Sequence, residues 1–431
     1  MIQSGFAITD ITPPVGACIP GGFSPIVSTG INDPLRVRAA VICDDTTALA
    51  LVGVDAVSLS TEDVLQARQQ AEALCAIPAA SIIIAASHTH TGGSANDVLG
   101  TPSDTHYRQH IVQQIASAIA LAHARRVPCE LGWGVGEASG LAWNRRWVLK
   151  DGRHATHADP SNEEVIGRAG PDDPQVVLLA ARDLDGHVLG FVGNFACHCT
   201  LRGGRAFSAD YPGAWNDQLE RFTGAPLVFL NGAMGDVTQI NRDAGFAYPQ
   251  KGEPVIRRFA HKLTGESLKL LADMHFTGDA SLTIATEIIE MPFRVPDAIQ
   301  LAQDRKMLEA AAPSDHSRDV VFARERLLLQ EYIEQHGTAR CEVICMRIGD
   351  LAITSSPGQM FCSFGLDMKK QSPFSATMVV SLANGNIGYV PTAEAIAKGG
   401  YEPTLCRGSR SVPEAGDRIV AVSSRLLRKL A

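Results

Sequence analysis

The sequence lacks the features that mark several classes of protein. No apolar stretch approaches the roughly 20 residues that span a bilayer, and the first residues show no charged segment followed by an apolar one, as a secretion signal does. The net charge is −8 at pH 7, so the chain has no basic field that would attract nucleic acid or an anionic membrane. We therefore expect a cytoplasmic protein with a small-molecule substrate, no nucleic-acid partner and no stable membrane association.

Regular cysteine motifs and other catalytic signatures are also missing. Ten cysteines are scattered through 431 residues without C-x-x-C spacing, which predicts neither a structural zinc nor a catalytic disulfide and agrees with a reducing compartment. G-x-S-x-G, the P-loop motif and H-E-x-x-H do not occur. Cys197 and Cys199 flank His198, but a continuing strand would turn both away from that histidine, and we expect them in the core.

Apolar periodicity predicts a mixed α/β chain. The expected elements are a hairpin of strands 38–43 and 48–54, a helix beginning near Ser60, a buried strand 81–86, a helix 105–126, a hairpin of strands 175–181 and 187–195, a strand 226–230, a helix 255–274, a strand 281–291, helical segments within 297–336 and a hairpin within 341–354. This order favours mixed β-sheets with flanking helices in layers. We expect one domain over residues 1–431, with the polar stretch 151–174 as a candidate lid loop.

Three histidines stand at the ends of expected strands. His88 and His90 follow strand 81–86 in the run S-H-T-H-T-G-G, and they project to the same side if the strand continues. From this run alone, loop histidines bonded to the backbone are an equally good interpretation. His198 ends the apolar strand 188–195, and imidazoles from two strand ends are suitable zinc ligands. Metal-assisted hydrolysis is therefore the leading class of function.

Seven short motifs, in order, resemble the neutral (non-lysosomal) ceramidases and their bacterial homologues. They are GFAITDITP at 5–13, SHTHTG at 87–92, NR at 144–145, NFACH at 194–198, NGAMGDV at 231–237, PG at 357–358, and YVPT at 389–392 with YE at 401–402. Chance agreement of seven motifs in the right order is improbable. The resemblance covers residues 5–402 and implies the layered α/β catalytic domain of that family. The C-terminal sandwich domain of its larger members is not expected here.

The resemblance also implies a site with one Zn²⁺ per chain. In this family zinc is held by the first H-T-H histidine, the histidine closing the N-F-A-x-H strand, a glutamate after P-G and the tyrosine opening Y-V-x-T. The matching positions here are His88, His198, Gln359 and Tyr389. The family's second H-T-H histidine, an arginine and a tyrosine twelve residues after the ligand tyrosine contact the reacting amide, and these positions are His90, Arg145 and Tyr401. The implied activity is hydrolysis of an amide, or of a related ester or lactone, by a zinc-activated water.

Gln359 departs from the family pattern, because an amide oxygen is a weaker zinc ligand than a carboxylate. Three outcomes follow: Gln359 coordinates, Asp210 or Asp236 replaces it, or the chain is a non-catalytic small-molecule-binding relative without tight metal binding. A cysteine-dependent hydrolase using Cys199 or Cys197 with His90 is a weaker hypothesis. Only 6% of residues are aromatic, so we expect a smaller, soluble amide rather than ceramide.

Overall fold

The larger of two facing β-sheets carries most of the N-terminal half of the chain. The structure is a computed structural model that describes residues 1–243 and 249–431. The sheet has the order β16-β14-β13-β8-β1-β5-β6-β7, with β18 paired to β8. Its strands are β1 (Gln3–Asp10), β5 (Arg36–Cys43), β6 (Ala48–Val54), β7 (Ile82–Ala86), β8 (Val127–Glu137), β13 (Gln175–Asp183), β14 (Val188–Phe195), β16 (Leu227–Asn231) and β18 (Phe276–Thr277). Neighbours are antiparallel except at the two ends, where β7 joins β6 and β16 joins β14 in parallel.

A smaller sheet packs against one face of the larger one. It has the order β19 (Leu282–Pro292), β20 (Thr338–Ile348), β21 (Leu351–Ser355) and β23 (Ala376–Val380). Buried aliphatic residues of both sheets, such as Ile83, Leu179, Ile344 and Met378, form one continuous core between them. This apolar layer holds the two sheets face to face.

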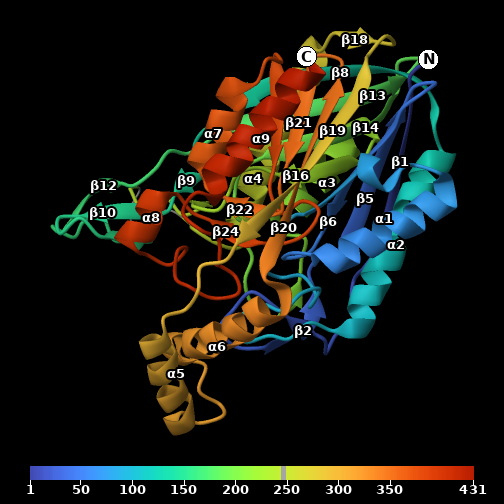
Figure 1. Cartoon of the computed structure of the whole chain (residues 1–431). Coiled ribbons are helices and arrows are strands. Elements are labelled where there is room, and N and C mark those ends of the chain that lie inside the picture. Colours follow the sequence, from blue (N-terminus) through green and yellow to red (C-terminus); the bar gives the residue numbers. More distant parts are fainter. Residues whose placement is uncertain (244–248) are drawn as a thin grey trace.

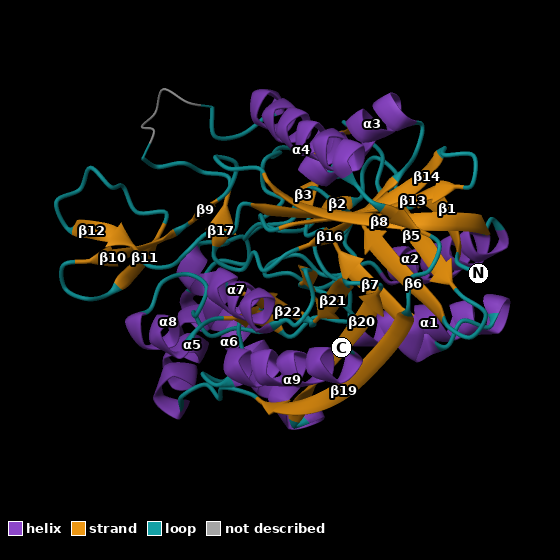
Figure 2. Cartoon of the chain, turned by 90° about the horizontal axis from the view of Figure 1, so that it is seen from above, coloured by secondary structure: helices purple, strands orange, loops and turns teal. Residues whose placement is uncertain are grey.

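Helices cover the outer faces of both sheets (Figure 2). α1 (Thr61–Cys75), α2 (Thr105–Ala124), α3 (Asp210–Thr223) and α4 (Glu253–Asp273) pack on the larger sheet, and α7 (Cys362–Gln371) and α9 (Ala415–Leu430) pack on the smaller one. The result is a helix–sheet–sheet–helix arrangement, which confirms the predicted α/β class. Local sequence sets the helix starts: the Ser60 side chain accepts from the Asp63 N–H, and Asp104 caps α2 in the same way.

Several smaller elements connect or extend these layers. They are β2 (Cys18–Ile19), β3 (Ile26–Val27), β4 (Gly30–Ile31), β9 (Trp143–Asn144), β10 (Arg146–Leu149), β11 (His154–Thr156), β12 (Val165–Arg168), β15 (Ala206–Phe207), β17 (Val237–Thr238), β22 (Gly358–Met360), β24 (Gly388–Val390), α5 (Ala298–Ala310), α6 (Arg318–His336), α8 (Ala393–Lys398) and a 3₁₀ turn at Ala79–Ser81. α5 and α6 project from the body of the molecule (Figure 1). In the part of the chain that the structure describes, no helix combines the length and the hydropathy needed to cross a bilayer.

The predicted hairpins and helices are confirmed to within a few residues, but two expectations need correction. Strand β7 ends at Ala86, so the H-T-H run lies beyond the strand and not within it. The stretch 151–174, expected as one long loop, contains β11 and β12, which pair with β10 in a small antiparallel sheet. None of the residues 151–174 is among the residues that line the cavity described below.

Candidate metal centre

The loops that follow β7 and β14 bring the three histidines together. His88 has a φ of 70°, so the chain turns sharply after β7 and strand alternation is not what sets the ring direction. Its N–H donates to Ala56 O at 2.9 Å, and the His90 N–H donates to Cys199 O at 3.1 Å. These backbone bonds tie the first histidine loop to the end of β6 and to the loop that carries His198.

The buried side-chain amide of Asn231 holds both histidine loops in place. Asn231 ends β16 and is fully buried. Its Nδ2 donates to Ser87 O at 2.9 Å and to Cys197 O at 3.1 Å, which are the carbonyl groups directly before His88 and His198. One side chain therefore sets the position of two histidines that are 110 residues apart in sequence.

The three imidazoles converge with the same nitrogen facing inward. Their ligand atoms all lie within 4.8 Å of one another, and Nε2 of His88 is 3.3 Å from Nε2 of His90. Nδ1 of His88 faces Val57 O at 2.7 Å, Nδ1 of His90 faces Gly21 O at 3.1 Å, and Nδ1 of His198 faces Met234 O at 2.7 Å. A carbonyl oxygen can only accept, so each Nδ1 carries the proton and each Nε2 presents a lone pair.

Burial keeps these rings neutral. Desolvation lowers the pKa of His88 and His198 well below the usual value, and it lowers the pKa of His90 to about 4. Three neutral rings with inward lone pairs repel one another unless a cation lies between them. The cluster therefore has the tautomer, the charge state and the backbone support of a metal site.

Two oxygen donors come from a short parallel pair of strands. Gln359 of β22 stands directly opposite Tyr389 of β24 in the register. The Tyr389 hydroxyl lies 3.3 Å from Nε2 of His198. Gln359 is 8% exposed, and its Oε1 is buried with no hydrogen-bond partner, as expected of an acceptor whose partner is a bound cation. The donor set at this position fits a metal ion.

The two aspartates that could replace Gln359 have other partners. The Asp236 carboxylate accepts from Cys362 N at 2.7 Å and from Asn144 Nδ2 at 2.7 Å. The Asp210 carboxylate accepts from the N–H groups of Arg202 and Tyr211. Among the described residues, no carboxylate joins the histidine cluster, and neither aspartate takes the place of Gln359 there.

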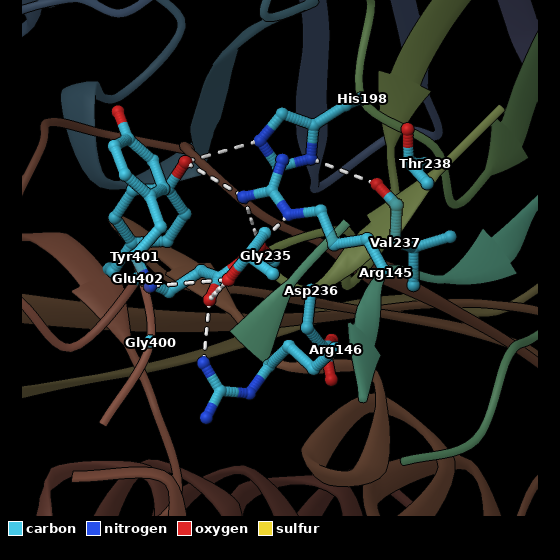
Figure 3. A network of polar contacts seen from close by, with 12 residues as sticks. Arg145, Arg146, His198, Gly235, Asp236, Val237, Thr238, Gly400, Tyr401 and Glu402 are labelled. Atoms are coloured by element: carbon cyan, nitrogen blue, oxygen red, sulfur yellow. Dashed lines mark hydrogen bonds and ion pairs between the residues drawn. The ribbon is translucent and has the colours of Figure 1, made fainter. Parts of the chain in front are cut away.

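A buried charge network orients Arg145 beside the cluster (Figure 3). Arg145 Nε donates to Glu402 at 2.7 Å, and its Nη2 donates to the Tyr389 hydroxyl at 3.0 Å. Arg146 binds the other Glu402 oxygen at 2.6 Å. Burial raises the pKa of Glu402, but the two guanidinium groups outweigh it and hold that pKa below its usual value. Two arginines on one carboxylate leave one positive charge in excess at the site.

The cluster opens into a cavity of about 630 Å³ that is lined by the loop carrying His88 and His90, by α6 and by the segment 401–410. His88, His90, Gln359, Tyr389 and Tyr401 all line it. The Tyr401 ring meets the Tyr389 ring edge-on, with 6.2 Å between centroids. His90 is partly exposed, whereas His88 and His198 are buried. The structure therefore brings together all seven residues that the resemblance implied.

Cys197 and Cys199 are core residues, as expected. Both are fully buried, and the Cys199 thiol donates to Ser87 O at 2.9 Å. Burial raises the pKa of both thiols well above the usual value, which argues against a thiolate nucleophile at this site. The His90 ring nitrogens face Gly21 and His88 and not either cysteine.

Fold and site together define an α/β protein with a metal-type histidine centre in a large cavity. A model of the neutral/alkaline non-lysosomal ceramidase family, N-terminal, matches residues 3–222, which is about half of the chain. The chain therefore belongs to that family, and the resemblance in the sequence is confirmed. Membership indicates a hydrolase that acts on an amide bond.

Two solved structures have the same fold over the whole of this chain. Neutral ceramidase from Pseudomonas aeruginosa is 18% identical, with a TM-score of 0.73, and the match covers 100% of this chain and 74% of that one. A structure described as ceramidase complexed with C2 is 17% identical, with a TM-score of 0.75 and coverage of 100% and 75%. No curated protein sequence gave a significant match.

Two supporting residues were not assigned roles from the sequence. Asn231 and Glu402 both lie in motifs that carry the resemblance, but a motif does not say what its residues contact. Glu402 lies 257 positions from Arg145, and only the fold places them together.

Proposed function

We propose that this protein is a zinc-dependent hydrolase that cleaves the amide bond of a small soluble N-acyl compound. The observation that supports this most is the convergence of three Nε2 lone pairs whose Nδ1–H groups are held by backbone carbonyls. In the proposal His88, His198, Tyr389 and Gln359 hold the ion. Zinc in such a site supplies a water whose pKa is lowered to about 7 and polarises the amide carbonyl.

His90 is the proposed acid–base residue. It is the partly exposed member of the cluster, so a substrate in the cavity meets it directly. Its pKa of about 4 means that it is unprotonated at neutral pH. It can therefore take the proton of the attacking water and return it to the leaving nitrogen.

Arg145 and Tyr401 are proposed to stabilise negative charge on the amide oxygen. The excess positive charge of Arg145, Arg146 and Glu402 supports this, because the site is buried and little water screens the charge. Arg145 is held in place by Glu402 and so needs little reorganisation during the reaction. The Tyr401 side chain lines the cavity, and its ring contacts that of Tyr389, to which Arg145 donates.

The proposed test compares two arginines that share one partner. The zinc-loaded protein is assayed on a fluorogenic short-chain N-acyl aminocoumarin, before and after a chelator. Arg145→Lys is expected to lower kcat/KM by about 100-fold, the usual effect of removing one oxyanion donor. Arg146→Lys is the control, because Arg146 also binds Glu402 but does not contact Tyr389.

The proposal is supported if the chelator abolishes activity and zinc restores it, and if Arg145→Lys has much lower activity than wild type whereas Arg146→Lys does not. Hydrolysis that survives complete metal removal contradicts it. Absence of hydrolysis together with absence of metal favours the non-catalytic, small-molecule-binding alternative that Gln359 suggested.

A further inference from the structure

The wall of the same cavity contains a buried arginine that no carboxylate neutralises. Arg410 lines the cavity and is 8% exposed. Its Nη2 donates to Asn386 O at 2.9 Å and its Nη1 donates to Arg407 O, whereas its Nε is buried without a partner. The Tyr332 side chain is a further hydrogen-bond partner, and within the described ranges 1–243 and 249–431 no carboxylate pairs with Arg410.

The other arginines of this wall lie beside carboxylates. Arg407 binds Glu325 at 2.7 Å and Asp97 at 3.1 Å. Arg340 lies 3.6 Å from Glu342, a carboxylate that Arg68 also binds at 2.7 Å. A buried charge without a counter-ion is costly, so the lone guanidinium of Arg410 requires an explanation.

Aromatic rings set the orientation of this guanidinium. Its carbon lies 4.9 Å from the centroid of the Tyr332 ring and 5.7 Å from that of Phe293. Such cation–π contacts offset part of the cost of burial and hold the planar group in one orientation. They do not neutralise its charge.

The segment that carries Arg410 is hydrogen-bonded to the strand that carries Tyr389. The Tyr389 N–H donates to Gly408 O at 2.8 Å, and Gly388 forms a bridge with Ser409. Arg410 follows two residues after Gly408, so its Cα lies no more than roughly 7 Å from that of Gly408. A small substrate that reaches both Tyr389 and Arg410 fits within a cavity of 630 Å³.

We propose that Arg410 binds a carboxylate on the substrate, so that the substrates are N-acylated amino acids. This inference rests on the proposed amide hydrolysis and adds the chemical class of the leaving group. In an N-acyl amino acid the carboxylate is one carbon from the amide nitrogen. The planar guanidinium of Arg410 has no carboxylate partner of its own, and a guanidinium suits the two oxygens of a carboxylate that enters the cavity.

The test compares two substrates that differ only in the carboxylate. N-octanoylglycine and N-octanoylethylamine share the acyl chain and the amide, and a methyl group replaces the carboxylate in the second. For the zinc-loaded protein we expect kcat/KM to be about 10- to 100-fold higher for N-octanoylglycine, the usual range for a charge-assisted hydrogen bond. Arg410→Gln, which keeps a donor for Asn386 O, is expected to remove this preference and to leave hydrolysis of N-octanoylethylamine within about threefold.

Arg340→Gln is the control, because it removes a positive charge at the same wall from an arginine that lies beside a carboxylate. It is expected to keep the preference. Equal rates for the two substrates in the wild type, or an unchanged preference in Arg410→Gln, overturn the inference while the proposed hydrolysis stands.

Binding is measured in parallel by calorimetry on the same full-length proteins. This keeps the inference testable if neither amide is cleaved, an outcome that counts against the proposed hydrolysis alone. Wild type is then expected to bind N-octanoylglycine at least about 10-fold more tightly than N-octanoylethylamine. Equal affinities overturn the inference. If Arg410→Gln does not fold, Arg410→Lys is expected to keep only part of the preference, and a full preference in Arg410→Lys counts against a guanidinium fork.

Discussion

Replacing Asn231 with aspartate is expected to loosen the metal centre without changing any ligand. Asn231 donates to the carbonyl groups before His88 and His198, at 2.9 and 3.1 Å. A protonated aspartic acid can donate to only one of these oxygens, and the other keeps only its second donor, the Cys199 thiol at Ser87 O or the Tyr211 hydroxyl at Cys197 O. The loss of one buried hydrogen bond lowers the unfolding free energy by about 0.5–1.5 kcal/mol. The affinity for zinc is expected to fall about 10- to 100-fold, because the residues that orient metal ligands have effects of that size.

Asn194→Asp separates the two effects. Asn194 is equally buried, and its Nδ2 also donates to two carbonyl groups, of Leu230 at 2.7 Å and Val379 at 2.9 Å, but neither adjoins a histidine of the cluster. We expect Asn194→Asp to lower the unfolding free energy in urea by a similar amount while its zinc affinity, measured by chelator competition, stays within about threefold of wild type. Equal losses of zinc affinity in the two variants would refute the idea that Asn231 positions the ligands.

Three further predictions concern the metal ligand, acid stability and the thiols. Gln359→Glu adds a negative charge beside the cluster, so we expect zinc to bind at least about 10-fold more tightly in chelator competition, and an unchanged affinity would place Gln359 outside the site. Burial, assisted by Arg145, lowers the pKa of His157 to about 4 in the folded chain. Between pH 6.5 and pH 4 the unfolded chain binds a proton at His157 and the folded chain does not, so the unfolding free energy falls as the pH falls. Urea titrations at several pH values should show a smaller fall in His157→Asn than in wild type. Iodoacetamide at pH 8 should leave Cys197 and Cys199 unmodified by mass spectrometry and hydrolysis intact, whereas inactivation on labelling of either thiol would favour the cysteine mechanism.

Local sequence signals predicted the elements of the fold accurately. Ser60 as a helix cap, the turn between β13 and β14 and the apolar run of β7 each act over a few residues, so a local pattern is sufficient to recognise them. The stretch 151–174 was misjudged because its polar composition hides two short strands, which are held by pairing with β10 and not by an apolar face.

The site could be predicted only in part, because most of it depends on long-range contacts. Strand alternation suggested that His88 and His90 face the same way, which is correct for a different reason: the backbone turns at His88, and the carbonyl groups of Val57 and Gly21 fix the rings. No periodicity indicates that Glu402 lies beside Arg145, or that Arg410 lacks a counter-ion. Such facts depend on which distant segments the fold brings together.

Zinc stoichiometry of the purified protein tests the central claim most directly. Elemental analysis is made on wild type, His88→Ala and His198→Ala after incubation with zinc and removal of excess ion. His187→Ala is the control, because His187 belongs to the exposed group Asp183, Asp185 and His187, the other set of possible metal ligands in the described part of the chain. The account predicts about one zinc per chain in wild type and in His187→Ala, and little in the other two variants. No zinc in wild type, or equal zinc in all four proteins, would contradict it.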